Sequence, residues 1–149
     1  MAHEVIIKKL EQIDRLLTEL SRLLSSSFAI FKDNIDSIRA AERNFELIIE
    51  LASDVNNEIA LVRGLPIADT YRGSFTQLEA AGVISKKLGD MLIEGARIRN
   101  ILVHEYDFEE DYEKFYESVK RLLPAYREYV AVIHKYIISF KVSKDENAQ

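Results

Sequence analysis

The residues best suited to chemistry lie in one short segment, Arg97-Ile98-Arg99-Asn100-Ile101-Leu102-Val103-His104-Glu105-Tyr106. On an α-helix, with about 100° per residue, Arg97, Asn100 and His104 share one narrow stripe. Arg99 is about 140° from His104 on the same helix, so only its long side chain could reach that stripe. A guanidinium binds phosphate through a bidentate fork, and an imidazole moves protons near neutral pH. This pattern indicates phosphate chemistry, with Asn100 positioning either partner.

The same residues also have a purely structural interpretation. The two arginines could pair with acidic side chains, and His104 could occupy a helix C-terminus, where cations are favoured. Glu50, Asp54 and Asn57 form a polar stripe at spacings of four and three on another helix, so these acids could be the partners. A supporting role for Asp54 and for Arg97 in the site is the functional alternative. The spacing alone leaves both interpretations open.

Other kinds of active site have little support in the sequence. The three histidines, His3, His104 and His134, lack metal-ligand spacing, and there is no cysteine. The chain has neither a glycine-rich phosphate loop nor a nucleophile elbow. We therefore expect no metal and no cofactor.

Hydrophobic periodicity predicts the helices that position these residues. A first helix over residues 3–24 has apolar side chains at steps of three and four: Ile6, Leu10, Ile13, Leu17, Leu20 and Leu24. A second helical stretch runs over about 31–62, with a break expected within 33–37 and an end at Gly64 and Pro66. Its predicted stripe comprises Ile35, Ile38, Phe45, Ile48, Ile49, Ala52, Val55 and Ile59.

Three more helices are predicted in the second half of the chain. A short one covers 70–81 and ends at Gly82, and the next, capped by Ser85, reaches about His104 with Leu88, Met91, Leu92, Ile98, Ile101 and Leu102 on its apolar side. The last spans about 109–140 and should kink at Pro124. Its apolar face comprises Phe115, Val119, Leu122, Leu123, Tyr126, Tyr129, Val130, Ile133 and Ile137. We expect one all-α domain over 1–149, a bundle of about five helices with a long kinked C-terminal helix and a frayed polar tail from about 141.

Composition limits the possible partners. The 149 residues have a net charge of −5 at pH 7, and the excess acid is concentrated in residues 105–117. Such acidity argues against broad coating of nucleic acid but is compatible with a small cationic cleft that has an acidic rim. No secretory signal and no apolar run of about 20 residues is present, so we expect a cytoplasmic protein without a membrane partner.

The segment from Arg99 to Tyr106 resembles the signature of the HEPN superfamily, in which four to six residues lie between an arginine, usually followed by a polar residue, and a histidine. Tyr106, two residues after the histidine, is similar to the HepT toxin branch in particular. Further parts of the chain also resemble that branch: 42–44, 48–54 with Asn57, Tyr71, 75–78, 80–84 and the closing long helix. The resemblance covers about residues 5–140.

The resemblance implies a metal-independent endoribonuclease toxin of a type VII-like toxin–antitoxin pair. It implies a homodimer that brings two motifs together, an RNA substrate, and a cognate minimal nucleotidyltransferase (MNT) antitoxin that adds AMP to Tyr106. In that view His104 transfers protons, Arg99 stabilises the phosphate, and Asn100 orients either His104 or the scissile phosphate.

Two other interpretations remain open. The chain could be a non-catalytic helical module that binds a nucleotidyltransferase or a nucleotide through the motif. It could also be a structural bundle in which the arginine and histidine are incidental.

Overall fold

The computed structural model describes residues 2–104 and 111–147, and these residues form helices without any strand. The helices are α1 (Ala2–Leu23), α2 (Phe28–Phe31), α3 (Ile35–Val62), α4 (Tyr71–Ala80), α5 (Lys86–His104) and α6 (Asp111–Asn147). The predicted all-α bundle is confirmed, with the single-turn α2 as an addition to the five longer helices.

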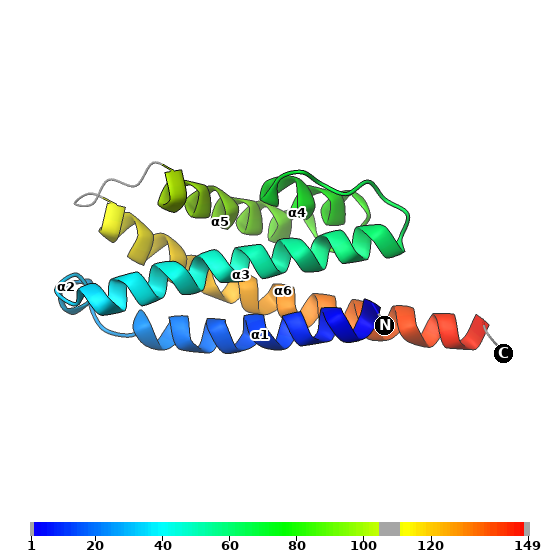
Figure 1. Cartoon of the computed structure of the whole chain (residues 1–149), viewed down its shortest axis with the longest axis horizontal. Helices are drawn as coiled ribbons and strands as arrows, with labels where there is room; N and C mark the ends of the chain where they lie inside the picture. The colour runs from blue at the N-terminus through cyan, green and yellow to red at the C-terminus, as the bar shows by residue number, and fades with distance from the viewer. Residues whose placement is uncertain (1, 105–110, 148–149) are drawn as a thin grey trace.

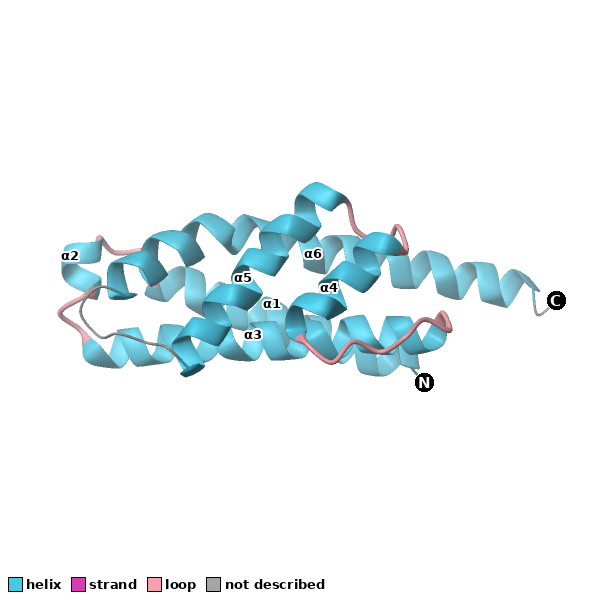
Figure 2. Cartoon of the chain, turned by 90° about the horizontal axis from the view of Figure 1, so that it is seen from above, coloured by secondary structure: helices cyan, strands magenta, loops and turns pink. Residues whose placement is uncertain are grey.

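The long helices lie roughly along one axis (Figure 1). α1 packs against α3 and against α6, while α4 and α5 pack against each other and against α3. α5 also contacts α6, and Figure 2 shows α4 and α5 side by side over α3. The C-terminal part of α6 extends beyond the other helices in both views. The result is a bundle in which α3 contacts helices from both halves of the chain.

Most predicted apolar stripes form the core. All six apolar residues of the α1 stripe are at most 2% exposed, and the α3 and α6 stripes are largely buried with them. Two residues depart from the prediction. Ile35 is 52% exposed because it is the first residue of α3, and Ile101 is 41% exposed because no described helix covers the last turn of α5 on that side. Near the end of α5, the apolar side chains of Ile101 and Val103 are therefore exposed among the described residues.

Side-chain caps fix where the helices begin. The predicted break after α2 is confirmed, and the Ser37 N–H donates to Asn34 Oδ1 at 3.1 Å to start α3. The Gly73 N–H donates to Thr70 Oγ1 at 2.9 Å at the start of α4, and the Leu88 N–H donates to Ser85 Oγ at 3.1 Å at the start of α5. Gly64, at φ 70°, follows the C-cap of α3 in the left-handed conformation that glycine adopts without strain.

The last helix is longer than predicted. α6 continues through Pro124 and reaches Asn147, so the helix extends beyond the predicted end near 140. This extension contains two lysines and one glutamate, and neither of the strongest helix breakers, glycine and proline, occurs in it. Figure 1 shows the first part of α6 inclined to its C-terminal part, in agreement with the kink expected from proline.

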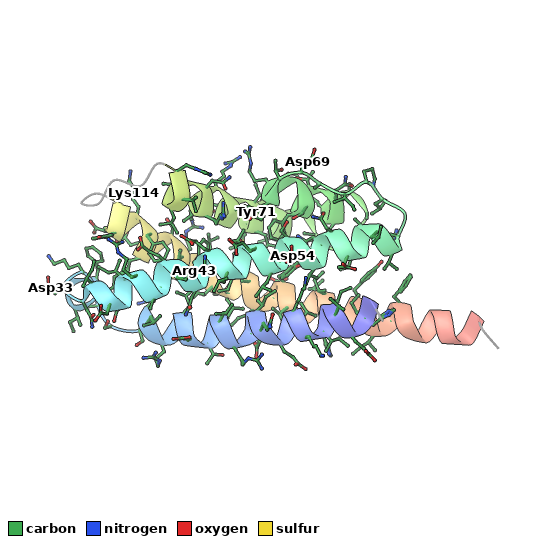
Figure 3. The ribbon with its side chains drawn as sticks, viewed as in Figure 1. Asp33, Arg43, Asp54, Asp69, Tyr71 and Lys114 are labelled. Atoms are coloured by element: carbon green, nitrogen blue, oxygen red, sulfur yellow. The ribbon has the colours of Figure 1, made fainter. Side chains whose placement is uncertain are left out.

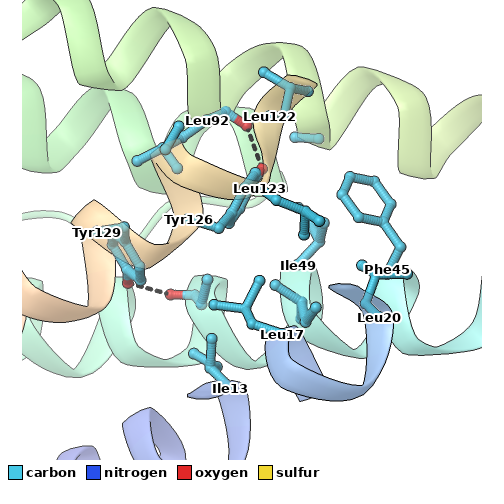
Figure 4. Close-up of a cluster of buried hydrophobic side chains, with 14 of the residues drawn as sticks. Ile13, Leu17, Leu20, Phe45, Ile49, Leu92, Leu122, Leu123, Tyr126 and Tyr129 are labelled. Carbon is cyan, nitrogen blue, oxygen red and sulfur yellow. Dashed lines mark hydrogen bonds between the residues drawn. The ribbon is translucent and has the colours of Figure 1, made fainter. Parts of the chain in front are cut away.

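A close contact between α5 and α6 depends on a glycine. The buried hydroxyl of Tyr126 donates to the Leu92 carbonyl at 2.8 Å, and burial raises the pKa of this phenol well above its usual value, which keeps the donor protonated (Figure 4). A Cβ on Gly95 would lie 2.0 Å from that hydroxyl. Gly95 therefore permits the close approach of α5 and α6 within one chain.

Buried hydrogen bonds connect α6, α3 and α4. The Tyr129 hydroxyl lies 3.1 Å from the Ala52 carbonyl and 2.5 Å from Asn56 Oδ1, and Asn56 Nδ2 donates to Ser74 Oγ at 3.0 Å. Ser74 Oγ in turn donates to the Tyr71 carbonyl at 2.7 Å. We call Tyr129, Asn56 and Ser74 the buried relay. It fixes the first turn of α4 on α3.

No helix within 2–104 or 111–147 is both long enough and apolar enough to cross a membrane.

Replacing Gly95 with alanine should lower the free energy of unfolding by about 1–3 kcal/mol, because the new methyl group collides with the buried Tyr126 ring. Urea unfolding followed by circular dichroism measures the change. Gly89→Ala is the matched control, since a Cβ at Gly89 meets only the end of the flexible Glu79 side chain. Alanine there should be neutral or stabilising by up to about 1 kcal/mol through helix propensity. Equal effects at both positions would contradict the assigned contact.

Candidate functional site

Arg99 is held in place by three neighbours from three directions. Its Nη2 lies 3.3 Å from Glu50 Oε1 on α3, and its Nη1 donates to Asn100 Oδ1 at 3.4 Å. Its guanidinium carbon lies 4.6 Å from the centre of the Tyr71 ring, a cation–π distance. The side chain is only 14% exposed, and its buried Nε–H has no hydrogen-bond partner among the described residues. Arg99 is therefore a fixed, largely neutralised cation that still has unused N–H donors.

The position of Tyr71 follows from the start of α4. Thr70 caps this helix, and the buried relay ends on the Tyr71 carbonyl through Ser74. The Tyr71 ring is thereby held against the face of Arg99. The contacts that order Arg99 thus reach back to Tyr129 in the core of the bundle.

His104 lies in a different environment from Arg99. It is the last residue of α5, is exposed, and lines an open pocket of about 330 Å³ together with Arg72, Arg97, Asn100 and Ile101. Arg72 comes from α4, and the other four residues come from α5. No acidic side chain lines this pocket within the described part of the chain. We call it the cationic pocket. It combines two guanidinium groups, an imidazole and an amide.

A second polar pocket of about 410 Å³ adjoins the first, since Asn100 lines both. Figure 3 shows Asp54 on α3 and Asp69 on the loop before α4, which line this second pocket together with Tyr71. Asn57 Oδ1 accepts the Ala68 N–H at 3.2 Å and so holds the same loop against α3. Among the described side chains, no group of three or more His, Asp or Glu residues is arranged to hold a metal ion.

The structure brings together some of the residues singled out in the sequence and separates others. Arg97, Asn100 and His104 line one pocket, as their shared stripe predicts. Arg99 does not line it, because its side chain turns toward Glu50 and Tyr71. Tyr106 lies outside the described residues.

The two acidic residues of the α3 stripe, Glu50 and Asp54, have different ion-pair partners. Glu50 forms the expected ion pair with an arginine of α5, whereas Asp54 pairs with Lys9 of α1 at 3.4 Å. Asp54 nevertheless borders the second pocket next to Asn100. The structural interpretation of acid–arginine pairing thus holds for Arg99. Arg97 has no acidic partner among the described residues.

Sequence reasoning did not select Arg72. It precedes the motif by more than twenty residues and lies on a different helix, and only the packing of α4 against α5 places it beside His104. Its one unusual feature in the sequence is a basic side chain in the first turn of a helix, where the helix dipole favours acidic ones.

Comparison with known proteins identifies the family to which this chain belongs. The model of a family described as "Ribonuclease HepT-like" matches residues 6–133. A tRNA nuclease HepT from Aphanizomenon flos-aquae is 26% identical over 141 residues, covering 95% of this chain and 95% of that protein. An mRNA nuclease HepT from Shewanella oneidensis is 26% identical over 131 residues, covering 79% of this chain and 98% of that protein.

A solved structure is similar over nearly the same length. It is a tri-AMPylated HEPN toxin of Shewanella oneidensis in complex with an MNT antitoxin. The likeness has a TM-score of 0.78 at 26% identity, covering 87% of this chain and 96% of that one.

Proposed function

This chain belongs to the HepT-like ribonuclease family, and we propose that it is the RNA-cleaving toxin of a HEPN–MNT toxin–antitoxin pair. The observation that supports this most is the cationic pocket, in which His104 and Asn100 lie with two arginine side chains and no described carboxylate. Such a pocket suits a polyanionic substrate, and a histidine within it can move the protons that phosphodiester cleavage requires.

The proposed reaction needs no metal. A base removes the proton from the 2′-hydroxyl of RNA, and the 2′-oxygen attacks the adjacent phosphorus. The bond from phosphorus to the 5′-oxygen then breaks, and an acid protonates that oxygen, which leaves a 2′,3′-cyclic phosphate and a 5′-hydroxyl. His104 transfers protons, and Asn100 orients His104 or the phosphate from its place between the two pockets.

Arg99 is proposed to stabilise the pentacovalent phosphate. Two of its five N–H donors make the contacts with Glu50 and Asn100, so other donors are available to a phosphate oxygen. Contact with Glu50 and Tyr71 fixes the guanidinium in advance, which lowers the cost of ordering it in the transition state. The positions of Arg97 and Asp54 fit supporting roles, in the cationic pocket and in the second pocket respectively.

A homodimer would complete the site. One chain supplies a single histidine in the motif, whereas cleavage needs both a base and an acid. Within one chain, Arg99 also points away from the pocket that contains His104. Within the motif segment, Ile101 and Val103 are 41% and 45% exposed, and they form the apolar surface that a partner copy would cover.

The antitoxin is proposed to be a minimal nucleotidyltransferase that transfers AMP from ATP to Tyr106. Two observations support this partner: the similar Shewanella toxin is AMPylated and bound to an MNT antitoxin, and Tyr106 follows His104 by two residues. The tyrosine oxygen would attack the α-phosphorus of ATP, release pyrophosphate and lose its proton. The added phosphodiester would put negative charge and bulk beside the pocket and exclude RNA.

Replacing His104 with alanine should slow RNA cleavage about 100-fold or more, the usual loss when a general acid–base group is removed. Cleavage of a labelled RNA in excess EDTA measures it, and the wild type should remain active and give cyclic-phosphate ends. His134→Ala is the control, since this histidine is exposed on α6 away from the motif. Wild-type rates in His104→Ala would refute the role of His104. Antitoxin binding by a wild type that cleaves no RNA would favour the non-catalytic module instead.

Replacing Val103 with glutamate should weaken the dimer about 10-fold or more, because it buries an unpaired charge at the proposed contact. Sedimentation velocity over a concentration series measures the dissociation constant. The matched control is Ile138→Glu, at an equally exposed apolar residue on α6 that is 47% exposed. A wild type that is monomeric while it cleaves RNA would contradict the shared site.

Incubation with the antitoxin and ATP should add the mass of AMP to the peptide containing Tyr106, and this addition should abolish cleavage. Mass spectrometry of the digested protein identifies the modified residue, with Tyr106→Phe as the control that removes only the acceptor oxygen. Modification of Tyr106→Phe to the wild-type extent would show that another residue is the acceptor.

A further inference from the structure

Among the described residues, the two arginines of the cationic pocket have no partner of the kind that most arginines of this protein have. The chain contains ten arginines, and six have an acidic or tyrosine hydroxyl partner: Arg22, Arg39, Arg43, Arg63, Arg99 and Arg121. Among the described residues, the side chains of Arg72 and Arg97 form no ion pair or hydrogen bond. Both line the same pocket beside His104.

Two like charges at one pocket, with no carboxylate among its described lining residues, repel each other when no anion is bound. Arg72 adds a second cost, because a cation in the first turn of α4 opposes the helix dipole. An anion in the pocket removes both costs. In an acidic chain of net charge −5, many carboxylates were available to neutralise this position, yet none among the described residues does so.

The backbone that presents Arg72 is well anchored. Its neighbour on one side, Tyr71, is fixed through the buried relay and stacks on Arg99, and its neighbour on the other side, Gly73, donates to the Thr70 cap. The α4 helix therefore holds the Arg72 backbone at the side of the pocket that faces Arg97 and His104 of α5. A strand that occupies the pocket thus meets cations from two helices.

We propose that Arg72 is an RNA-binding residue that holds a backbone phosphate of the substrate on the α4 side of the cationic pocket. This inference rests on the proposed function, since the anion it names is the RNA strand that His104 cleaves. Arg72 binds the strand and leaves the proton transfers to His104. Its removal should therefore weaken substrate binding more than it slows the chemical step.

The test measures RNA binding separately from cleavage. A fluorescent single-stranded RNA is titrated with His104→Ala protein and with the same protein carrying Arg72→Gln, over a series of salt concentrations. Arg72→Gln should weaken binding about 5-fold and reduce the salt slope by about 0.7, the value of one lost phosphate contact on a single strand. In otherwise wild-type protein it should raise KM about 5-fold with kcat nearly unchanged.

Two variants serve as controls. Arg127→Gln removes the same charge from an exposed arginine of α6 that also has no described partner, and it should leave the affinity and the slope unchanged. Arg72→Lys keeps a cation and should restore most of the slope while recovering only part of the affinity, because it lacks the fork. Matching circular dichroism spectra and unfolding midpoints establish that all variants are folded.

The outcomes separate this inference from the function on which it rests. Cleavage by the wild type, together with equal binding by the Arg72→Gln and Arg127→Gln proteins, would overturn the role of Arg72 and leave the function standing. RNA binding that depends on Arg72 in a wild type that never cleaves would support the binding role and refute the ribonuclease. Loss of antitoxin binding without any loss of RNA binding in Arg72→Gln would also overturn the inference.

Discussion

The buried contact between the Tyr129 hydroxyl and the Asn56 amide is the interaction on which the position of the site depends. Both side chains are fully buried, so each polar atom needs a partner within the protein or costs about 1–3 kcal/mol. The Asn56 amide donates a hydrogen bond to the Ser74 hydroxyl, and this hydroxyl donates to the Tyr71 carbonyl. The observed packing of α4 on α3 satisfies all of these groups. Tyr71, and with it the face of Arg99, takes its place from this packing.

The arginines of the site fall into two classes that follow from their surroundings. Glu50 neutralises Arg99, and the Tyr71 ring covers it, so this guanidinium is ordered before any ligand arrives. Arg72 and Arg97 are exposed, and their charge is available to an incoming anion. A division between one fixed cation and two accessible ones suits a site that must first attract a polyanion and then hold one phosphate rigidly.

Periodicity predicted the helices and most of the core because a buried helix face must repeat every three to four residues. The α1 stripe from Ile6 to Leu24 is buried throughout for this reason. The same pattern failed at Ile101, since periodicity identifies an apolar face but does not tell whether a neighbour covers it. The kink at Pro124 and the break within 33–37 were predicted correctly because such signals act on the adjacent backbone.

Periodicity and local backbone signals do not predict features that depend on contacts between segments distant in the sequence. The stripe of Arg97, Asn100 and His104 was visible because all three lie on one helix. Arg72 was not, because it joins them through the packing of α4 on α5. Gly95 is intrinsically unfavourable within a helix, and the side chain that requires it, Tyr126 of α6, lies more than thirty residues away in the sequence. The orientation of Arg99 toward α3 likewise depended on Glu50 and Tyr71 rather than on the motif.

The order of α5 and α6 along the chain affects when the site can be assembled during synthesis. Chain growth delivers α1 to α5, with Arg99 and His104 already present, before Tyr126 and Tyr129 are made. A nascent chain that stops before Tyr129 lacks the hydroxyl that satisfies Asn56, and one that stops before Tyr126 leaves the α5 face around Gly95 uncovered. The contacts that hold α4 and α5 in place are therefore complete only after α6 has been synthesised. An incomplete copy of this protein would contain the whole motif without the packing that arranges it.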